Sequence, residues 1–341
     1  SIEVIEEYND DHLSCILCTS GTTGEIKLVK LSYMNLYSSF ISWNHEIKFK
    51  SIDRYACCIP LHHIGGISII VRSTIVGFSV DLCLPFNSDK VRGIIDKSIS
   101  IISLVPTMLD KILDGSKINS KILKAIIVGG DAMPDTLLDK SLKLNLPIYK
   151  TYGMTETSSG ISGFFVSSNL NKKHTSGRPF KNVSIKLLNN TFLVNGPMVM
   201  QGYVGRLTSN NLTNSFHSND IGKIDADGFV IVLGRKDRTI LSGGEKINLI
   251  EVESALLCHP KVNGAKAKGI KDSKWGNRLV VAIDLDEKIS LDELNFWCKN
   301  YLNNYSIPKN FILGVDSFED NGNILKDKDW KKILNQGKLI R

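Results

Sequence analysis

Short apolar runs alternate with helical stretches through residues 55–152, and this alternation constrains the fold more than any other feature of the sequence. Such a pattern is typical of a parallel sheet whose faces are covered by helices. The strands that it predicts are residues 55–59, 78–84, 101–105, 124–128 and 147–152, and the helices begin near residues 88, 106 and 133. The sequence therefore predicts an α/β fold for this part of the chain.

The loops that follow these strands are rich in glycine and polar side chains. In sheets of this class, ligands bind at the carboxyl ends of the strands. Residues 60–66, 129–131 and 152–156 each follow or end an expected strand, and we place residues 19–24 at the same edge. We therefore expect these four loops to converge on one ligand.

The loop at residues 19–24 reads Thr-Ser-Gly-Thr-Thr-Gly, with Lys27 just beyond it. Its glycines let backbone N–H groups approach closely, its hydroxyls donate hydrogen bonds and Lys27 adds a positive charge, so it can hold a polyphosphate. It differs from the P-loop, because no Lys-Ser/Thr pair follows the second glycine. We expect residues 13–18 to form a buried strand of the parallel sheet and Ser32 to cap a helix from Tyr33. The alternative for this loop is a polar surface turn.

The pattern of the sequence changes after Gly177. Strand-like runs at residues 183–188, 191–195 and 228–233 predict a small antiparallel unit. A charged loop then leads to a second, α+β domain, with a helix at residues 250–257, a strand at 279–284, a helix at 291–302 and a strand at 311–315. With a boundary between Lys236 and Asp237, the domains are residues 1–236 and 237–341.

The chain has 341 residues, of which 42% are hydrophobic and 23% are charged, values typical of a globular protein of about two domains. The net charge is +7, and the densest basic stretches are residues 261–278 and 326–341. We interpret both stretches as solvent-exposed faces, since no nucleic-acid-binding motif accompanies them. No apolar run approaches the roughly 20 residues that cross a bilayer, so we expect no membrane insertion.

Seven cysteines, an odd number, lie mostly within apolar runs. This usage favours reduced thiols in the core and a reducing compartment, so we expect a cytoplasmic protein. Cys15 and Cys18 have the spacing of half a zinc site or of a redox pair, but the partner half is missing. We interpret both as core residues.

Four motifs occur in order along the chain: the loop at residues 19–24, Tyr-Gly-Met-Thr-Glu at 152–156, Asn-Asp-Ile-Gly at 219–222 and Gly-Arg-Lys-Asp at 234–237. Together they closely resemble the adenylate-forming acyl-CoA synthetases, a superfamily that includes luciferase and the adenylation domains of non-ribosomal peptide synthetases. The resemblance covers almost the whole chain. Residues 60–66 and 149–157 look most like the o-succinylbenzoate–CoA ligases of menaquinone biosynthesis.

The resemblance implies a ligase that joins a carboxylic acid to AMP from ATP and then transfers the acyl group to coenzyme A. Two anions must be brought together, so charge neutralisation and alignment supply most of the catalysis. Glu156 would help hold Mg²⁺, Thr155 would bond the α-phosphate and Asp220, beside Arg235, would accept the ribose hydroxyls. The other ATP-binding residues implied are Thr19, Ser20, Gly21, Thr22, Thr23, Gly24 and Lys27 for the outer phosphates, with Gly129, Gly130, Asp131, Tyr152 and Gly153 around adenine.

The resemblance also implies residues for the acyl substrate. His63 matches a histidine that borders the acyl and pantetheine channels in the family, although His62 stands where phenylalanine is usual. Arg72, Ser158 and Ser159 are candidates for meeting an acidic acyl substrate. The alternative for Arg72 is a charge on a helix surface.

The C-terminal domain resembles the family's mobile lid, with Asp237 at the position of its hinge. Hinges are short loops between domains that absorb large changes of φ and ψ. Gly243 and Gly244 would line the pantetheine tunnel, and the basic run at residues 266–274 is a candidate for the CoA phosphates.

Two departures from the family bear on function. The catalytic lysine of its final motif is replaced by Asn323, which is neutral and too short to substitute for it, and Lys326, at the motif's second basic position, is the remaining candidate. Only 18 residues precede Thr19, fewer than the family usually carries, so we expect a short lineage or a fragment.

Three hypotheses follow: an o-succinylbenzoate–CoA ligase, a ligase for another aromatic or medium-chain acid, and a catalytically weak relative that binds only nucleotide.

Overall fold

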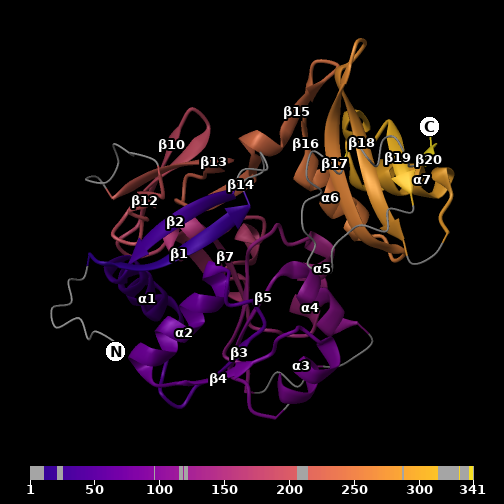
Figure 1. Ribbon diagram of the computed structural model, residues 1–341. Helices are drawn as coiled ribbons and strands as arrows, with labels where there is room; N and C mark the ends of the chain where they lie inside the picture. The colour runs from indigo at the N-terminus through magenta and orange to yellow at the C-terminus, as the bar shows by residue number, and fades with distance from the viewer. Residues whose placement is uncertain are drawn as a thin grey trace, which may run out of the picture. The chain divides into compact units, whose positions relative to one another are not determined.

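The structure is a computed structural model that describes residues 11–20, 26–95, 97–114, 118, 122–205, 214–285, 288–313, 330 and 338–340 (Figure 1). These residues form two compact units. The larger unit comprises residues 11–20, 26–218 and 222–233, and the smaller comprises 219–221 and those from 234 onward. The domain limits that we place between Lys236 and Asp237 stay a prediction.

A seven-stranded sheet forms the centre of the larger unit. Its strands, in spatial order, are β4 (Ser79–Leu82), β3 (Arg54–Cys57), β5 (Ile101–Leu104), β6 (Ala125–Val128), β7 (Ile148–Met154), β8 (Ser159–Phe165) and β9 (Arg178–Pro179). The first five are parallel, and β8 and β9 run antiparallel to their neighbours. The helices between the parallel strands are α2 (Ile64–Val76), α3 (Ser88–Ile95), α4 (Pro106–Leu113) and α5 (Asp135–Lys143). The predicted α/β class is confirmed, whereas α2 is a helix that the sequence patterns did not delimit.

Both faces of this sheet are buried. Ile102 and Ile126 belong to one apolar core, and Ile101 and Ile127, next to them in the chain, belong to another. Successive strand side chains point to opposite faces, so a strand between two cores is apolar at nearly every position. This explains why residues 125–128 are continuously apolar and why residues 101–105 contain a single polar side chain, Ser103, whose hydroxyl is hydrogen-bonded to that of Tyr55 at 2.7 Å.

The first strand differs from its prediction. β1 (Leu13–Ser20) pairs antiparallel with β2 (Ile26–Ser32), and β12 (Gly202–Tyr203) pairs with the other side of β2. Placing residues 13–18 as a buried strand of the parallel sheet was therefore wrong, and so was placing the loop at 19–24 between a strand and a helix. The reason is that residues 26–32 form a strand of their own, on which β1 turns back. As an edge strand, β1 leaves Leu13 and Ile16 exposed, by 49% and 45%.

The helix α1 (Tyr33–Ile47) begins where the sequence predicts. Ser32 Oγ accepts a hydrogen bond from Asn35 N at 3.2 Å, and Asn35 Oδ1 accepts one from Ser32 N at 3.0 Å. This reciprocal capping box satisfies backbone groups that have no partner inside the helix.

The antiparallel unit expected after Gly177 is present. It is a four-stranded sheet of β10 (Ser184–Leu188), β11 (Thr191–Asn195), β13 (Ser215–Ile224) and β14 (Val230–Arg235). Its core lies around Phe192, which is fully buried among Ile185, Val194 and Val230.

The smaller unit has an α+β architecture. A hairpin of β15 (Thr239–Ser242) and β16 (Glu245–Asn248) precedes a four-stranded sheet of β17 (Val262–Asp272), β18 (Gly276–Leu285), β19 (Asn310–Leu313) and β20 (Lys338–Ile340). Its helices are α6 (Leu249–Leu257) and α7 (Leu291–Tyr301). The sequence patterns missed β17, because its buried positions include the alanines Ala265 and Ala267, which give a weak hydrophobic signal between lysines.

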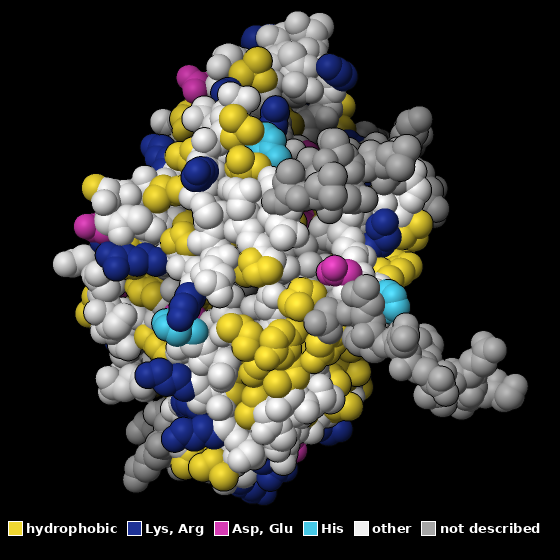
Figure 2. Space-filling view, turned by 90° about the vertical axis from the view of Figure 1, so that its left-hand side faces the viewer, with side chains coloured by type: hydrophobic (Ala, Val, Ile, Leu, Met, Phe, Trp, Pro, Cys, Tyr) yellow, Lys and Arg dark blue, Asp and Glu magenta, His cyan; other side chains and the backbone are white. Residues whose placement is uncertain are grey.

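The surface and the thiols refine the expectations from composition. All seven cysteines lie in the described residues and none forms a disulfide, but Cys18 is exposed, so its assignment to the core was wrong. Figure 2 shows basic side chains scattered around one concentration of apolar side chains. None of the described helices combines the length and the apolar character needed to cross a bilayer.

Candidate active site

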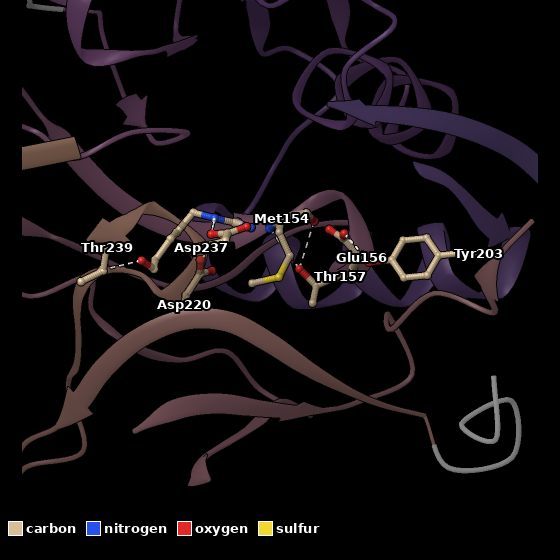
Figure 3. Close-up of polar contacts among 8 residues, drawn as sticks. Met154, Glu156, Thr157, Tyr203, Asp220, Asp237 and Thr239 are labelled. Carbon is tan, nitrogen blue, oxygen red and sulfur yellow. Dashed lines mark hydrogen bonds and ion pairs between the residues drawn. The ribbon is translucent and has the colours of Figure 1, made fainter. Parts of the chain in front are cut away.

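The motif at residues 152–156 lies where β7 ends. β7 passes into a single 3₁₀ turn, η1 (Thr155–Thr157), before β8 returns antiparallel to it. Thr157 Oγ1 closes the turn by donating to Met154 O at 3.1 Å (Figure 3). A Cβ on Gly153 would lie 2.1 Å from Ser159 O, so the close return of β8 requires glycine.

Glu156 is held through both its backbone and its side chain. Its carbonyl oxygen accepts a hydrogen bond from Met200 N at 2.9 Å, and Oε1 accepts one from the Tyr203 hydroxyl at 2.8 Å (Figure 3). Lys27 Nζ lies 5.5 Å from the centre of the Tyr203 ring. Two predicted residues of opposite charge, Glu156 and Lys27, therefore meet at one aromatic side chain. The sequence patterns missed Tyr203, because it follows a glycine in a two-residue strand and carries no motif of its own.

The Glu156 carboxylate suits a hard cation. It is half-buried, and no ion pair within the described part of the chain neutralises it. The same residues contain no group of three His, Cys, Asp or Glu side chains that could hold a metal by themselves. Mg²⁺ is commonly bound by one or two carboxylates together with waters and substrate phosphates. A single carboxylate fits a magnesium ion that is shared with a bound triphosphate.

The strand residues that flank residues 21–25 pair with each other. Thr19 pairs with Lys27 across β1 and β2, and Thr19 Oγ1 donates to Lys27 O at 3.4 Å. Ser20 pairs with Ile26. Gly21, Thr22, Thr23 and Gly24 lie outside the described residues, so their phosphate contacts stay a prediction.

Gly129, one of the glycines expected around adenine, packs against the strand that carries Tyr152. A Cβ on Gly129 would lie 2.8 Å from Thr151 Cγ2, and Gly130 has a φ of +83°. Asp131 Oδ1 accepts a hydrogen bond from the next backbone N–H at 2.7 Å. Gly129 therefore lies against Thr151, the residue before Tyr152, as expected if the loops after the strands converge. The contact of these residues with adenine stays a prediction.

Arg72 is a buried residue of α2, only 3% exposed, so the alternative of a charge on a helix surface was wrong. Its guanidinium carbon lies 4.6 Å from the centre of the Trp43 ring, and Nη2 donates to Ser159 Oγ at 3.2 Å. Burial lowers the pKa of Arg72 to about 10, although Tyr55 opposes this shift, so the side chain is charged at neutral pH. No carboxylate of the described residues pairs with it. A buried cation in this state favours an anionic ligand.

The two serines after η1 differ in their contacts. Ser158 is fully buried, and its hydroxyl donates to Met198 O at 2.8 Å. Ser159 is half-buried and lies against Arg72. Their φ values of +52° and +106° are unusual for residues other than glycine, and such strain is concentrated at functional sites. The structure therefore favours Ser159 over Ser158 as a group near a substrate, and the role of Ser158 stays a prediction.

His63 lies at the start of α2. Its exposed ring is 4.3 Å from the ring of His62, centre to centre. Partial desolvation, aided by the charge of His62, lowers the pKa of His63 below the ordinary histidine value. The imidazole is therefore neutral at physiological pH, and its place beside an acyl channel stays a prediction.

Within the smaller unit, Arg235 bridges two of the predicted acids. Its Nε and Nη2 donate to the two carboxylate oxygens of Asp237, each at 2.9 Å, and Nη1 donates to Asp220 Oδ1 at 3.3 Å (Figure 3). Asp220 is 6% exposed. This two-pronged contact fixes the plane of the guanidinium. The structure brings the three residues together, and their ribose and hinge roles stay predictions.

Gly243 and Gly244 form the turn between β15 and β16, with φ values of +58° and +89°. A Cβ on Gly243 would lie 2.7 Å from the Trp275 ring. Lys274 and Lys309 each place Nζ 5.3 Å from the centre of the same ring. Positive charge therefore collects beside the glycine turn, which suits the predicted contact with CoA phosphates. Asn323 and Lys326 lie outside the described residues.

Two family models match the chain. The model described as AMP-binding enzyme matches residues 2–204, and the model of the AMP-binding enzyme C-terminal domain matches residues 251–323. A 2-succinylbenzoate–CoA ligase of Bacillus licheniformis is 35% identical over 90% of this chain and 67% of its own length. Its counterpart in Bacillus subtilis is 32% identical over 99% of this chain and 72% of its own length. The chain spans about two thirds of the length of these relatives.

Two solved structures match this chain over a similar share of its length and at a similar identity. The o-succinylbenzoate CoA synthetase of Bacillus subtilis, in complex with the acyl-adenylate intermediate OSB-AMP, superposes with a TM-score of 0.83 at 32% identity, over 90% of this chain and 66% of that one. The same enzyme in complex with ATP and a magnesium ion gives a TM-score of 0.81 at 31% identity, over 92% and 69%. The resemblance that the four motifs predict is confirmed.

Proposed function

This chain belongs to the AMP-binding enzyme family, and from that premise we propose that it is an ATP-dependent carboxylic acid–CoA ligase that acts through an acyl-adenylate. The names of its relatives favour 2-succinylbenzoate as the acid. The observation that carries the proposal is the meeting of Glu156 and Lys27 at Tyr203, which places a carboxylate suited to Mg²⁺ near an ammonium suited to phosphate.

The proposed reaction has two halves. An oxygen of the carboxylic acid attacks the α-phosphorus of ATP, so that pyrophosphate leaves and an acyl-adenylate forms. The thiol of coenzyme A then attacks the acyl carbon, and AMP leaves. Repulsion between the two anions opposes the first half, and Lys27 with the loop at residues 19–24 would offset it. Mg²⁺, held in part by Glu156, would neutralise further phosphate charge, and Thr155 would bond the α-phosphate.

The remaining nucleotide contacts are proposed for each unit by itself. Gly129, Gly130, Asp131 and Gly153 would line the adenine slot, and Tyr152 would stack on the base. In the smaller unit, Asp220 would accept hydrogen bonds from the ribose hydroxyls, with its carboxylate oriented by Arg235.

Arg72 would select the acid. 2-Succinylbenzoate carries two carboxylates, of which only one is activated, so the other requires a cationic partner. Arg72 offers a buried guanidinium that no described carboxylate neutralises. A monocarboxylic acid would leave that charge unpaired, which favours the dicarboxylic substrate over other aromatic or medium-chain acids. His63 would border the acyl channel.

The lid functions are proposed on the same premise. Asp237 would be the hinge, Gly243 and Gly244 would line the pantetheine tunnel and Lys326 would be the remaining candidate for the basic group of adenylation. The absence of disulfides supports a reducing, cytoplasmic location.

The test is a panel of acids with the full chain, ATP, Mg²⁺ and coenzyme A. Pyrophosphate release and acyl-CoA formation are measured with 2-succinylbenzoate, benzoate and a medium-chain acid, and ATP binding is measured by calorimetry. Preferential turnover of 2-succinylbenzoate supports the proposal. Turnover of another acid would assign a different substrate, and ATP binding without turnover of any acid would favour the catalytically weak relative.

A further inference from the structure

Tyr203 contacts two residues of opposite charge through two different parts of its side chain. Its hydroxyl donates to Glu156 Oε1 at 2.8 Å, whereas the ammonium of Lys27 lies over its ring, 5.5 Å from the centre. We propose that Tyr203 is a positioning residue that keeps Glu156 and Lys27 apart and directs them to the metal ion and to the phosphates. This inference rests on the proposed function.

The backbone fixes the geometry of this contact. Tyr203 pairs with Val29 in the antiparallel register of β12 and β2, and Lys27 lies two residues from Val29, so both side chains emerge on the same face of β2. Glu156 is tied to the segment that leads into β12, because Met200 N donates to Glu156 O at 2.9 Å. The ring is therefore held by strands and by a short turn, and a change of its functional groups leaves these backbone contacts in place.

The arrangement matters because Glu156 and Lys27 are natural partners for each other. A direct ion pair would neutralise both groups and remove the charges that Mg²⁺ and a triphosphate require. The aromatic ring gives the ammonium a weak, non-neutralising contact, since cation–π attraction at a partly exposed site is modest. The phenol hydroxyl occupies one lone pair of the carboxylate and leaves the others for a metal, as outer hydrogen bonds commonly do for metal-binding carboxylates.

Two substitutions separate the two contacts. Tyr203→Phe removes the hydrogen bond to Glu156 and keeps the ring under Lys27, whereas Tyr203→Leu removes both. Tyr301→Phe, at the end of α7 and 48% exposed, is the matched control for loss of a tyrosine hydroxyl. Thermal unfolding and circular dichroism establish that each variant is folded.

The experiment measures binding rather than turnover. The affinity for Mn²⁺ in the presence of ATP is followed by electron paramagnetic resonance, and metal-free ATP binding is followed by calorimetry in EDTA. Tyr203→Phe is expected to weaken Mn²⁺ binding about tenfold and to leave metal-free ATP binding unchanged. Tyr203→Leu is expected also to weaken metal-free ATP binding, roughly threefold.

The outcomes separate this inference from the proposed function. Mn²⁺ affinity of Tyr203→Phe equal to that of the unmodified chain, or equal losses of metal and metal-free ATP binding in both variants, would overturn the positioning role while leaving the ligase proposal intact. Failure of the unmodified chain to bind ATP with or without metal would overturn both.

Discussion

The guanidinium of Arg72 lies 4.6 Å from the centre of the Trp43 ring and 5.9 Å from that of Phe49, inside the larger unit. Aromatic faces and the Ser159 hydroxyl partly solvate the cation without neutralising it. Because the pKa of Arg72, lowered by burial to about 10, still exceeds neutral pH, the charge persists, and in the proposed function it would pair with an anionic group of the substrate.

Arg72→Met is therefore expected to lower kcat/KM for a dicarboxylic acid such as 2-succinylbenzoate about 100-fold, because a buried charge pair is lost. The value for a monocarboxylic acid should change little. Arg54→Met, which removes an arginine whose side chain is 46% exposed beside Asp81, is the control. An equal loss for both classes of acid would show that Arg72 supports the fold and does not select the substrate.

Gly153→Ala is expected to destabilise the protein by about 3 kcal/mol, since its Cβ would lie 2.1 Å from the Ser159 carbonyl oxygen and force β7 and β8 apart. Gly93→Ala is the matched control, because nothing lies within 4 Å of a Cβ there and the site is in α3. That substitution should be neutral or stabilising by up to about 1 kcal/mol. Urea unfolding measures both, and similar free energies of unfolding for the two variants would contradict the close approach.

Asn323→Lys is expected to raise the rate of pyrophosphate release on the order of tenfold, because it restores an ammonium for the developing charge of adenylation. Asn321→Lys adds the same charge two residues away and should have little effect. The rate of thioester formation from a preformed acyl-adenylate should not change. If Asn323→Lys gives no gain and Lys326→Met abolishes pyrophosphate release, the role belongs to Lys326.

Because Lys150 has a lowered pKa in the folded protein, the free energy of unfolding should depend measurably on pH. Burial lowers its pKa to about 8 from the ordinary 10.5, and Nζ donates to Lys173 O at 2.6 Å. Between pH 8 and 10.5 the unfolded chain keeps this proton and the folded chain has lost it, so the contribution of Lys150 to the free energy of unfolding rises with pH and is lost as pH falls through 8.

The comparison of the unmodified chain with Lys150→Met isolates this term. From pH 8 to pH 10.5, the free energy of unfolding of the unmodified chain should increase by about 2 kcal/mol relative to that of Lys150→Met. Lys143→Met, at an exposed position of α5, should show no such change. Parallel pH profiles for the unmodified chain and Lys150→Met would mean that the Lys150 ammonium is not desolvated in the folded state.

The local parts of this protein are determined by its sequence alone. Ser32 and Asn35 cap α1 through groups three residues apart, and the largely apolar runs at residues 101–105 and 125–128 are typical of strands buried between two layers. These features depend on neighbours along the chain, which a pattern of residues reports directly. The four motifs likewise predicted the family.

Only the tertiary structure decided the partner of β1, the burial of Arg72 and the meeting of Lys27, Glu156 and Tyr203. Lys27, Glu156 and Tyr203 are far apart in the sequence. They come together because β12 pairs with β2 and because Glu156, in η1, accepts a hydrogen bond from Met200 in the segment that leads into β12. Such contacts depend on how strands pair in space, and two pairings of the same strands give nearly the same local pattern. For this reason a basic residue in an apolar helix could be taken for a surface charge, although packing has buried it.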